Sequence, residues 1–211
     1  MYEQEKQQVI QAGITLHTYR LISLSGGNVS LRIGDHVLIT PSGMTYEELV
    51  PDDIVVMDLD GKIIEGTRRP SVDSEALLYI LKNQPHLRTV IHTHQPYATA
   101  VGLFTDELPA VVMPLLNATR GPVAVAPYSS SASIDMGIMA AKYLKGTLAV
   151  ILKHHGVVTV GETLKEALYA AVYLEDSAKT YCIARSASQD LPVLTGSQLK
   201  QAVEGFNDYG Q

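Results

Sequence analysis

The sequence predicts an α/β protein in which helices cover both faces of a mixed, largely antiparallel central sheet, giving three layers. Two observations support this prediction. Strand-like and helix-like patterns are interspersed along all 211 residues rather than segregated into separate parts of the chain. Two hairpin signals, Gly34-Asp35 and Asp60-Gly61, each separate a pair of short apolar strands, which makes much of the sheet antiparallel.

Apolar residues in the first part of the chain recur at helical spacing until a small-residue segment, residues 25–28, ends the pattern. The two hairpins follow, with the turn Pro41-Ser42-Gly43 between them. A helix that ends before Pro85 then leads into a buried strand. In order, we expect a helix at 3–21, strands at 29–32 and 37–40, a helical turn at 46–49, strands at 54–59 and 62–64, a helix at 71–83 and a strand at 89–93.

The second part of the chain continues the alternation of helices and strands. Gly146 is placed to end one helix, and Thr163 is a good N-cap for a long one. We expect helices at 97–104 and 133–144, strands at 111–113, 123–126, 148–153 and 157–160, and helices at 164–187 and 197–206.

The composition, with 46 % hydrophobic and 18 % charged residues, is typical of a soluble globular protein, and the length suits one domain over residues 1–211. The formal net charge of -6 gives no reason to expect nucleic acid or an anionic membrane as a partner. The single cysteine, Cys182, excludes an intrachain disulfide and a thiolate metal site. The chain starts without a signal-peptide pattern, and no apolar stretch is long enough to span a membrane, so we expect a cytoplasmic protein.

His92 and His94 close an apolar run at residues 87–91 that is typical of a buried strand. Because side chains alternate along a strand, the two histidines point the same way and form a potential chelating pair. His155 follows a second apolar strand, and three neutral imidazoles with an open fourth position are typical of a catalytic zinc site. Two points stay open: His-X-His pairs also occur as ordinary buried residues, and His154 is an alternative to His155.

Two carboxylates, Asp73 and Glu75, lie near the start of the predicted helix that leads into the histidine-bearing strand. A carboxylate there can serve a metal or move protons. Acidic residues are also favoured at helix N-termini by the helix dipole, which explains both equally well. The residue pattern alone does not choose between them.

Three loops are rich in glycine, hydroxyl and amide groups: Gly26-Gly27-Asn28, Pro41-Ser42-Gly43 and Pro70-Ser71. Ser71 leads into a predicted helix, where free backbone amides bind phosphate. Ordinary turn chemistry explains any one of these loops as well. Near the C-terminus, Tyr209 either packs passively or serves as a phenolic proton donor on a mobile lid.

Seven segments occur in an informative order: Gly26-Gly27-Asn28-Val29-Ser30, Leu38-Ile39-Thr40-Pro41-Ser42-Gly43, Glu65-Gly66 through Pro70-Ser71, Val90-Ile91-His92-Thr93-His94, Ala126-Pro127-Tyr128, His155-Gly156 and Phe206 to Gly210. With these segments, nearly the whole chain resembles the class II aldolase/epimerase family. This is the zinc-dependent sugar-phosphate group that includes L-fuculose-1-phosphate aldolase, the nearer match, and L-ribulose-5-phosphate 4-epimerase.

The resemblance implies a class II aldolase-like fold and a zinc ion bound by His92, His94 and His155; imidazole ligands also accept manganese or cobalt. It implies that Asp73 moves the proton and enters and leaves the metal's ligand sphere. Asp73 is preferred to Glu75 because it stands three residues after Pro70, as in the family motif. The phosphate pocket would be formed by Gly27, Asn28, Ser42, Gly43 and Ser71.

The resemblance further implies a retro-aldol reaction, in which a ketose 1-phosphate is cleaved to dihydroxyacetone phosphate and an aldehyde. Tyr209 would then donate a proton, and a cyclic homotetramer would place active sites between subunits. Sugar-phosphate epimerisation and decarboxylation of a phosphorylated keto acid are alternatives on the same metal site. Three departures bear on the substrate: Val72 replaces a usual phosphate-binding serine, Met113 a tyrosine of the fuculose-phosphate enzyme, and Asn117 a catalytic aspartate of the epimerase.

Overall fold

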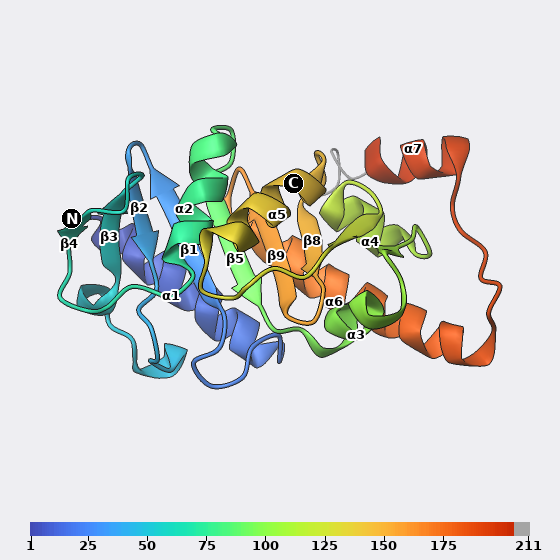
Figure 1. Cartoon of the computed structure of the whole chain (residues 1–211), viewed down its shortest axis with the longest axis horizontal. Coiled ribbons are helices and arrows are strands. Elements are labelled where there is room, and N and C mark those ends of the chain that lie inside the picture. The colour runs from blue at the N-terminus through green and yellow to red at the C-terminus, as the bar shows by residue number, and fades with distance from the viewer. Residues whose placement is uncertain (205–211) are drawn as a thin grey trace.

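The computed structural model describes residues 1–204 and shows a mixed sheet between two layers of helices (Figure 1). Its nine strands are β1 (Asn28–Ile33), β2 (His36–Ile39), β3 (Val55–Asp58), β4 (Ile63–Glu65), β5 (Thr89–Thr93), β6 (Glu107–Leu108), β7 (Val123–Ala126), β8 (Ala149–Leu152) and β9 (Gly156–Gly161). They are ordered β4-β3-β2-β1-β5-β9-β8-β7-β6. Within this sheet only β7 and β8 run parallel, so the predicted mixed, largely antiparallel sheet is confirmed.

The helices pack on both faces of this sheet. They are α1 (Glu3–Thr18), α2 (Ser74–Asn83), α3 (Pro96–Phe104), α4 (Met113–Thr119), α5 (Ile134–Leu144), α6 (Leu164–Ala187) and α7 (Gly196–Glu204), with two short 3-10 helices at Tyr46–Glu48 and Pro51–Asp53. Successive residues of β5 show the layering: Val90 packs into the core under α2 and α5, whereas Ile91 packs into the core under α1 and α6. The three layers predicted from the sequence are therefore present (Figure 1).

Local capping explains where the longest helix begins. The hydroxyl oxygen of Thr163 accepts from the Glu166 amide at 3.2 Å, and the Glu166 carboxylate accepts from the Thr163 amide at 3.3 Å. This reciprocal capping box satisfies two amides that a helix start leaves unpaired. At the end of α5, Lys145 and Gly146 both take positive φ, which stops the helix where the glycine predicted it.

One predicted element was wrong, and one predicted helix begins later than expected. The strand expected at 111–113 is absent; α4 begins at Met113 instead, because Pro114 sits in the first helical turn, where its missing N–H costs nothing. The strand that pairs with β7 is the two-residue β6. The helix expected from residue 71 begins at Ser74, so Ser71 and Asp73 belong to the turn before α2.

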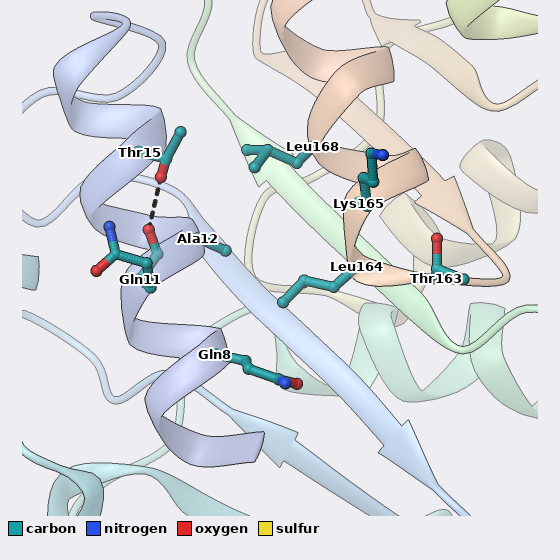
Figure 2. A pocket seen from close by; sticks show the side chains of 8 residues that line it. All are labelled: Gln8, Gln11, Ala12, Thr15, Thr163, Leu164, Lys165 and Leu168. Carbon is teal, nitrogen blue, oxygen red and sulfur yellow. Dashed lines mark hydrogen bonds between the residues drawn. The ribbon is translucent and has the colours of Figure 1, made fainter. Parts of the chain in front are cut away.

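An open groove of about 450 Å³ lies between α1 and the start of α6 (Figure 2). Its lining is Gln8, Gln11, Ala12, Thr15, Thr163, Leu164, Lys165 and Leu168. None of these residues belongs to the predicted metal or phosphate site. Among residues 1–204, no helix is both long and apolar enough to cross a membrane.

Candidate active site

Three histidines converge from two strand ends. His92 is the fourth residue of β5, His94 follows that strand, and His155 ends the turn between β8 and β9. Their potential ligand atoms all lie within 4.8 Å of one another, and the Nε2 atoms of His92 and His94 are 3.1 Å apart. Two distant stretches of sequence therefore supply three nitrogen donors to one point, as the spacing predicted.

The His92 ring is oriented by the backbone of the neighbouring strand. Its Nδ1 lies 2.9 Å from the carbonyl oxygen of Val157 in β9. Because a carbonyl only accepts, Nδ1 must carry the hydrogen, which leaves Nε2 as a free electron-pair donor. This is the usual outer contact of a metal-ligating histidine.

Burial keeps the central imidazole neutral. The pKa of His92 is lowered to about 4, chiefly by burial and to a lesser degree by the neighbouring His155 and His94, whereas Asp73 opposes the shift. Burial also lowers the pKa of His155, and the neighbouring His94 contributes to the same shift. Neutral rings are the form that binds a divalent ion.

The turn between β8 and β9 settles which of two adjacent histidines joins this cluster. His154 takes a left-handed conformation with φ of 61° and is exposed, whereas His155 is partly buried and lies 4.7 Å, ring to ring, from His92. The Nδ1 atom of His155 is buried without a hydrogen-bond partner among the described residues. Gly156 follows at once, and a Cβ at this position would lie 3.2 Å from Cδ2 of His94.

The carboxylate of Asp73 is held next to the histidines in the turn before α2. Asn28 is paired with His92 across β1 and β5, so both side chains project from the same face of the sheet. The Asn28 amide donates to Asp73 Oδ2 at 2.9 Å and to the Ser71 hydroxyl at 3.0 Å. The second carboxylate oxygen accepts from the Ala132 amide at 3.2 Å. The carboxylate is thus fixed by two donors while only 7 % of Asp73 is exposed.

The three glycine- and hydroxyl-rich loops lie side by side. A bridge joins Pro41 to Pro70, and the Ser42 amide donates to the Arg69 carbonyl at 2.9 Å. The Ser71 amide donates to the Thr40 carbonyl at 3.1 Å, so it is not the free helix-terminal amide expected from the sequence. Within residues 1–204, the amides of Gly27 and Gly43 donate to no backbone carbonyl.

Gly27 explains why the first loop contains glycine. Its φ is +72°, and a Cβ at this position would lie 2.5 Å from the carbonyl oxygen of His92. Only glycine fits both the conformation and the space. The loop can therefore approach the end of β5 directly beside His92 and His94.

Comparison with known proteins agrees with this geometry. A family model described as the Class II Aldolase and Adducin N-terminal domain matches residues 7–182. The chain belongs to this family. It is a class II aldolase, that is, a lyase.

Several relatives of this class II aldolase align over almost their whole length. It is 30 % identical to 5-deoxy-D-ribulose 1-phosphate aldolase of Bacillus thuringiensis serovar kurstaki, over 100 % of this chain and 99 % of the relative. It is also 30 % identical to L-fuculose phosphate aldolase of Escherichia coli K12, over 97 % and 94 %. Among solved structures, an L-fuculose 1-phosphate aldolase superposes with a TM-score of 0.90 at 31 % identity, covering 96 % of this chain and 95 % of the other.

The other residues singled out from the sequence of this class II aldolase are exposed, lie in α4, or fall outside the described residues. Glu75 is exposed in the first turn of α2, whereas Asp73 is buried and accepts hydrogen bonds from Asn28 and Ala132. Met113 is half-exposed at the start of α4, and Asn117 lies one turn later. Tyr209 lies outside the described residues.

Sequence reasoning missed two functional contacts of this class II aldolase, and both are backbone groups. One is the Val157 carbonyl that orients His92, and the other is the Ala132 amide that holds Asp73. Backbone groups leave no residue-type signal. Ala132 does carry an indirect structural sign, a positive φ of 51°, which is unusual for a residue with a Cβ.

Proposed function

We propose that the chain is a divalent-metal-dependent aldolase that cleaves a ketose 1-phosphate, of the L-fuculose-1-phosphate kind, to dihydroxyacetone phosphate and an aldehyde. One observation carries the proposal: three convergent imidazoles lie beside a carboxylate that is fixed by Asn28 and Ala132. The names of the relatives, a deoxyribulose 1-phosphate aldolase and fuculose phosphate aldolases, support a phosphorylated ketose as substrate.

The donor set fits the metal that the family implies. Three imidazole nitrogens within one coordination shell suit zinc, and also manganese or cobalt, with a position left for substrate oxygens. His94 is exposed, so the shell is open on its side. We propose zinc bound by His92, His94 and His155; when bound, it supplies Lewis acidity to the ketose carbonyl.

Asp73 is the proposed proton carrier. In the cleavage direction, a base removes the proton from the hydroxyl on one side of the scissile bond. The carbon–carbon bond then breaks, and its electron pair is taken up by the adjacent carbonyl-bearing fragment. That carbon must finally receive a proton, and Asp73 is placed to deliver it because its carboxylate lies beside the histidines. Asp73 would also enter and leave the ligand sphere of the metal.

The loops of Gly27, Asn28, Ser42, Gly43 and Ser71 are the proposed phosphate site. Their hydroxyls and the backbone amides of Gly27 and Gly43 provide donors on a chain whose net charge is negative. Binding energy from a phosphate remote from the reacting carbons would orient those carbons for cleavage. Val72, half-exposed between Ser71 and Asp73, provides an apolar surface where a serine is usual in the family.

We further propose that Tyr209 serves the aldehyde oxygen, to which it would donate a proton when the carbon–carbon bond forms in the reverse direction. We also propose that the enzyme is a cytoplasmic, single-domain protein assembled as a cyclic homotetramer. These statements rest on the family resemblance, and light scattering of the purified protein tests the assembly. A monomer in dilute solution would contradict the tetramer.

The deciding experiment offers a panel of ketose 1-phosphates to metal-loaded protein and follows triose phosphate release with a coupled dehydrogenase. We expect triose phosphate and an equimolar aldehyde. The His94→Ala variant should lose both bound metal and activity, whereas His86→Ala, which removes an exposed histidine, should keep both. A single isomeric pentose phosphate as product, with no free aldehyde, would overturn the lyase proposal in favour of epimerisation.

A further inference from the structure

A helix begins two residues after His94, and its first turn is capped from another part of the chain. α3 starts at Pro96, which has no N–H, so the next two amides are the ones that need acceptors. Oε1 of Glu175 accepts from the Tyr97 amide and Oε2 from the Ala98 amide, both at 2.9 Å. Gln95 occupies the N-cap position of α3 but makes no side-chain cap there. The cap is therefore supplied by the middle of α6.

Gln95 makes the second attachment to the same helix. It is fully buried, and its side-chain amide donates to the Ala171 carbonyl at 3.0 Å. Ala171 and Glu175 are four residues apart in α6, which places them one above the other on one helical face. Positions 95, 97 and 98 are consequently held by a single turn of α6.

Few polar contacts set the position of His94, although the backbones of Gly26 and Gly156 lie close to its ring. Within residues 1–204 its ring makes one hydrogen-bond contact, with His92, and no carbonyl or carboxylate holds its other nitrogen. His92, by contrast, is held by Val157. The ring of His94 is exposed, so surrounding side chains do not enclose it. Its location depends chiefly on the backbone that leads from β5 into α3.

We infer that Glu175 is a positioning residue for the metal centre, and that its bidentate cap on α3, together with the Gln95 anchor, fixes the backbone that presents His94. The inference rests on the proposed function, because it concerns the same three-histidine site. It assigns to Glu175 no contact with metal or substrate.

The chemistry of the cap explains why a carboxylate is needed. A carboxylate accepts from both amides and is favoured by the positive end of the helix dipole. A glutamine at position 175 could satisfy only one of the two amides, and its own NH2 group would face the other. Because Glu175 is only 9 % exposed, water would not readily replace the missing acceptor.

The test compares the Glu175→Gln variant with the wild type by titrating metal-free protein with Co²⁺ and recording its visible spectrum and dissociation constant. Loss of an outer contact to a metal site typically weakens binding about 10–100-fold, and we expect a loss in this range. At saturating metal, kcat should fall while KM for the ketose phosphate stays near the wild-type value, because the phosphate loops are attached elsewhere. The Co²⁺ spectrum should shift, reporting altered ligand geometry.

Glu166→Gln is the matched control. Glu166 also lies on α6 and caps a helix start, in this case that of α6 itself, and it pairs with Arg120 at 2.9 Å. Its loss should lower the free energy of unfolding by an amount similar to the Glu175 variant while leaving Co²⁺ affinity unchanged. If Glu175 had a purely structural role, both variants would be destabilised and both would bind Co²⁺ as tightly as the wild type does.

Equal Co²⁺ affinity in wild type and Glu175→Gln would overturn the inference. If the Glu175 variant fails to fold, Gln95→Met decides, because it removes only the contact with Ala171 and should also weaken Co²⁺ binding. Failure of the proposed function looks different: the wild-type protein would then bind Co²⁺ no better than His94→Ala.

Discussion

A Cβ on Gly156 would lie 2.3 Å from the backbone oxygen of Thr93. Gly156 follows His155 and opens β9, and Thr93 ends β5 just before His94. The close approach of these two backbones therefore brings the two histidine-bearing segments together. The neighbouring atom belongs to the backbone rather than to a flexible side chain, so it cannot move aside without shifting the end of β5.

Replacement of Gly156 by alanine should weaken metal binding as well as the fold. Overpacking of this kind costs about 1–3 kcal/mol, and we expect a loss of unfolding free energy in that range together with a lower metal affinity. Gly102→Ala is the control, because there the nearest atom is a side-chain methyl of Ile151 at 3.0 Å. Urea unfolding and metal titration of both variants check the prediction; normal metal affinity in Gly156→Ala would contradict it.

The Asp73→Asn variant should fold but lose most turnover. Asparagine keeps the size of the side chain but cannot carry the proton. It also turns one NH2 group toward either Asn28 or Ala132, which are both donors, at a cost of about 1–3 kcal/mol. Steady-state kinetics and thermal unfolding measure the two effects. Glu75→Gln should behave like the wild type, and the reverse pattern would transfer the role to Glu75.

The metal-free protein should become less stable as the pH falls from about 7 to 4. Burial lowers the pKa of His92 to about 4 from its ordinary value of 6.5, so the unfolded chain binds more protons in this interval. The unfolding free energy therefore decreases with falling pH, and 6.5 minus 4 corresponds to about 3 kcal/mol at most. Below pH 4 this contribution stops changing.

Urea unfolding at several pH values, with and without the His92→Asn substitution, measures the contribution of His92 to the pH dependence of the unfolding free energy. The comparison separates it from the carboxylates that titrate in the same range. The variant should show a flatter pH dependence than the wild type. His86→Asn removes an exposed histidine and should leave the slope unchanged. Parallel slopes for wild type and His92→Asn would show that His92 is not kept neutral by the fold.

Deletion of residues 206–211 should lower kcat while leaving Co²⁺ affinity unchanged, because the proposed metal ligands all precede it. Tyr209→Phe is the narrower variant, since it removes only the phenolic hydroxyl and should reproduce most of the kinetic loss. The kcat of each protein is measured from the amount of product formed at fixed reaction times. Wild-type kcat in Tyr209→Phe would remove this residue from the mechanism.

The sheet and the His92–His94 pair were predictable because both follow from local periodicity, whereas the choice of His155 over His154 depends on the turn between β8 and β9. Alternation along β5 places His92 on one face, and glycine signals mark the hairpins of the sheet. The choice of Asp73 over Glu75 was not available from local pattern, since either suits a helix start. It depends on Asn28, which lies 45 residues away in sequence and reaches Asp73 only when β1 pairs with β5.

The errors also have a physical source. The apolar residues Val111 and Val112 satisfy a strand pattern, but Pro114 favours a helix start, and a three-residue run is too short for periodicity to decide. The free amide expected at Ser71 is absent because the carbonyl of Thr40, just after β2, accepts a hydrogen bond from it. A proline outweighed the local pattern in the first case, and a partner distant in sequence did so in the second.

The contact between His92 and Val157 has one more consequence. The acceptor is a main-chain carbonyl, which every amino acid carries, so no single substitution at position 157 can delete it. Substitutions in the proposed phosphate loops would likewise leave this contact in place. The hydrogen position on the central imidazole is therefore set by the main chain of the sheet and not by any replaceable side chain.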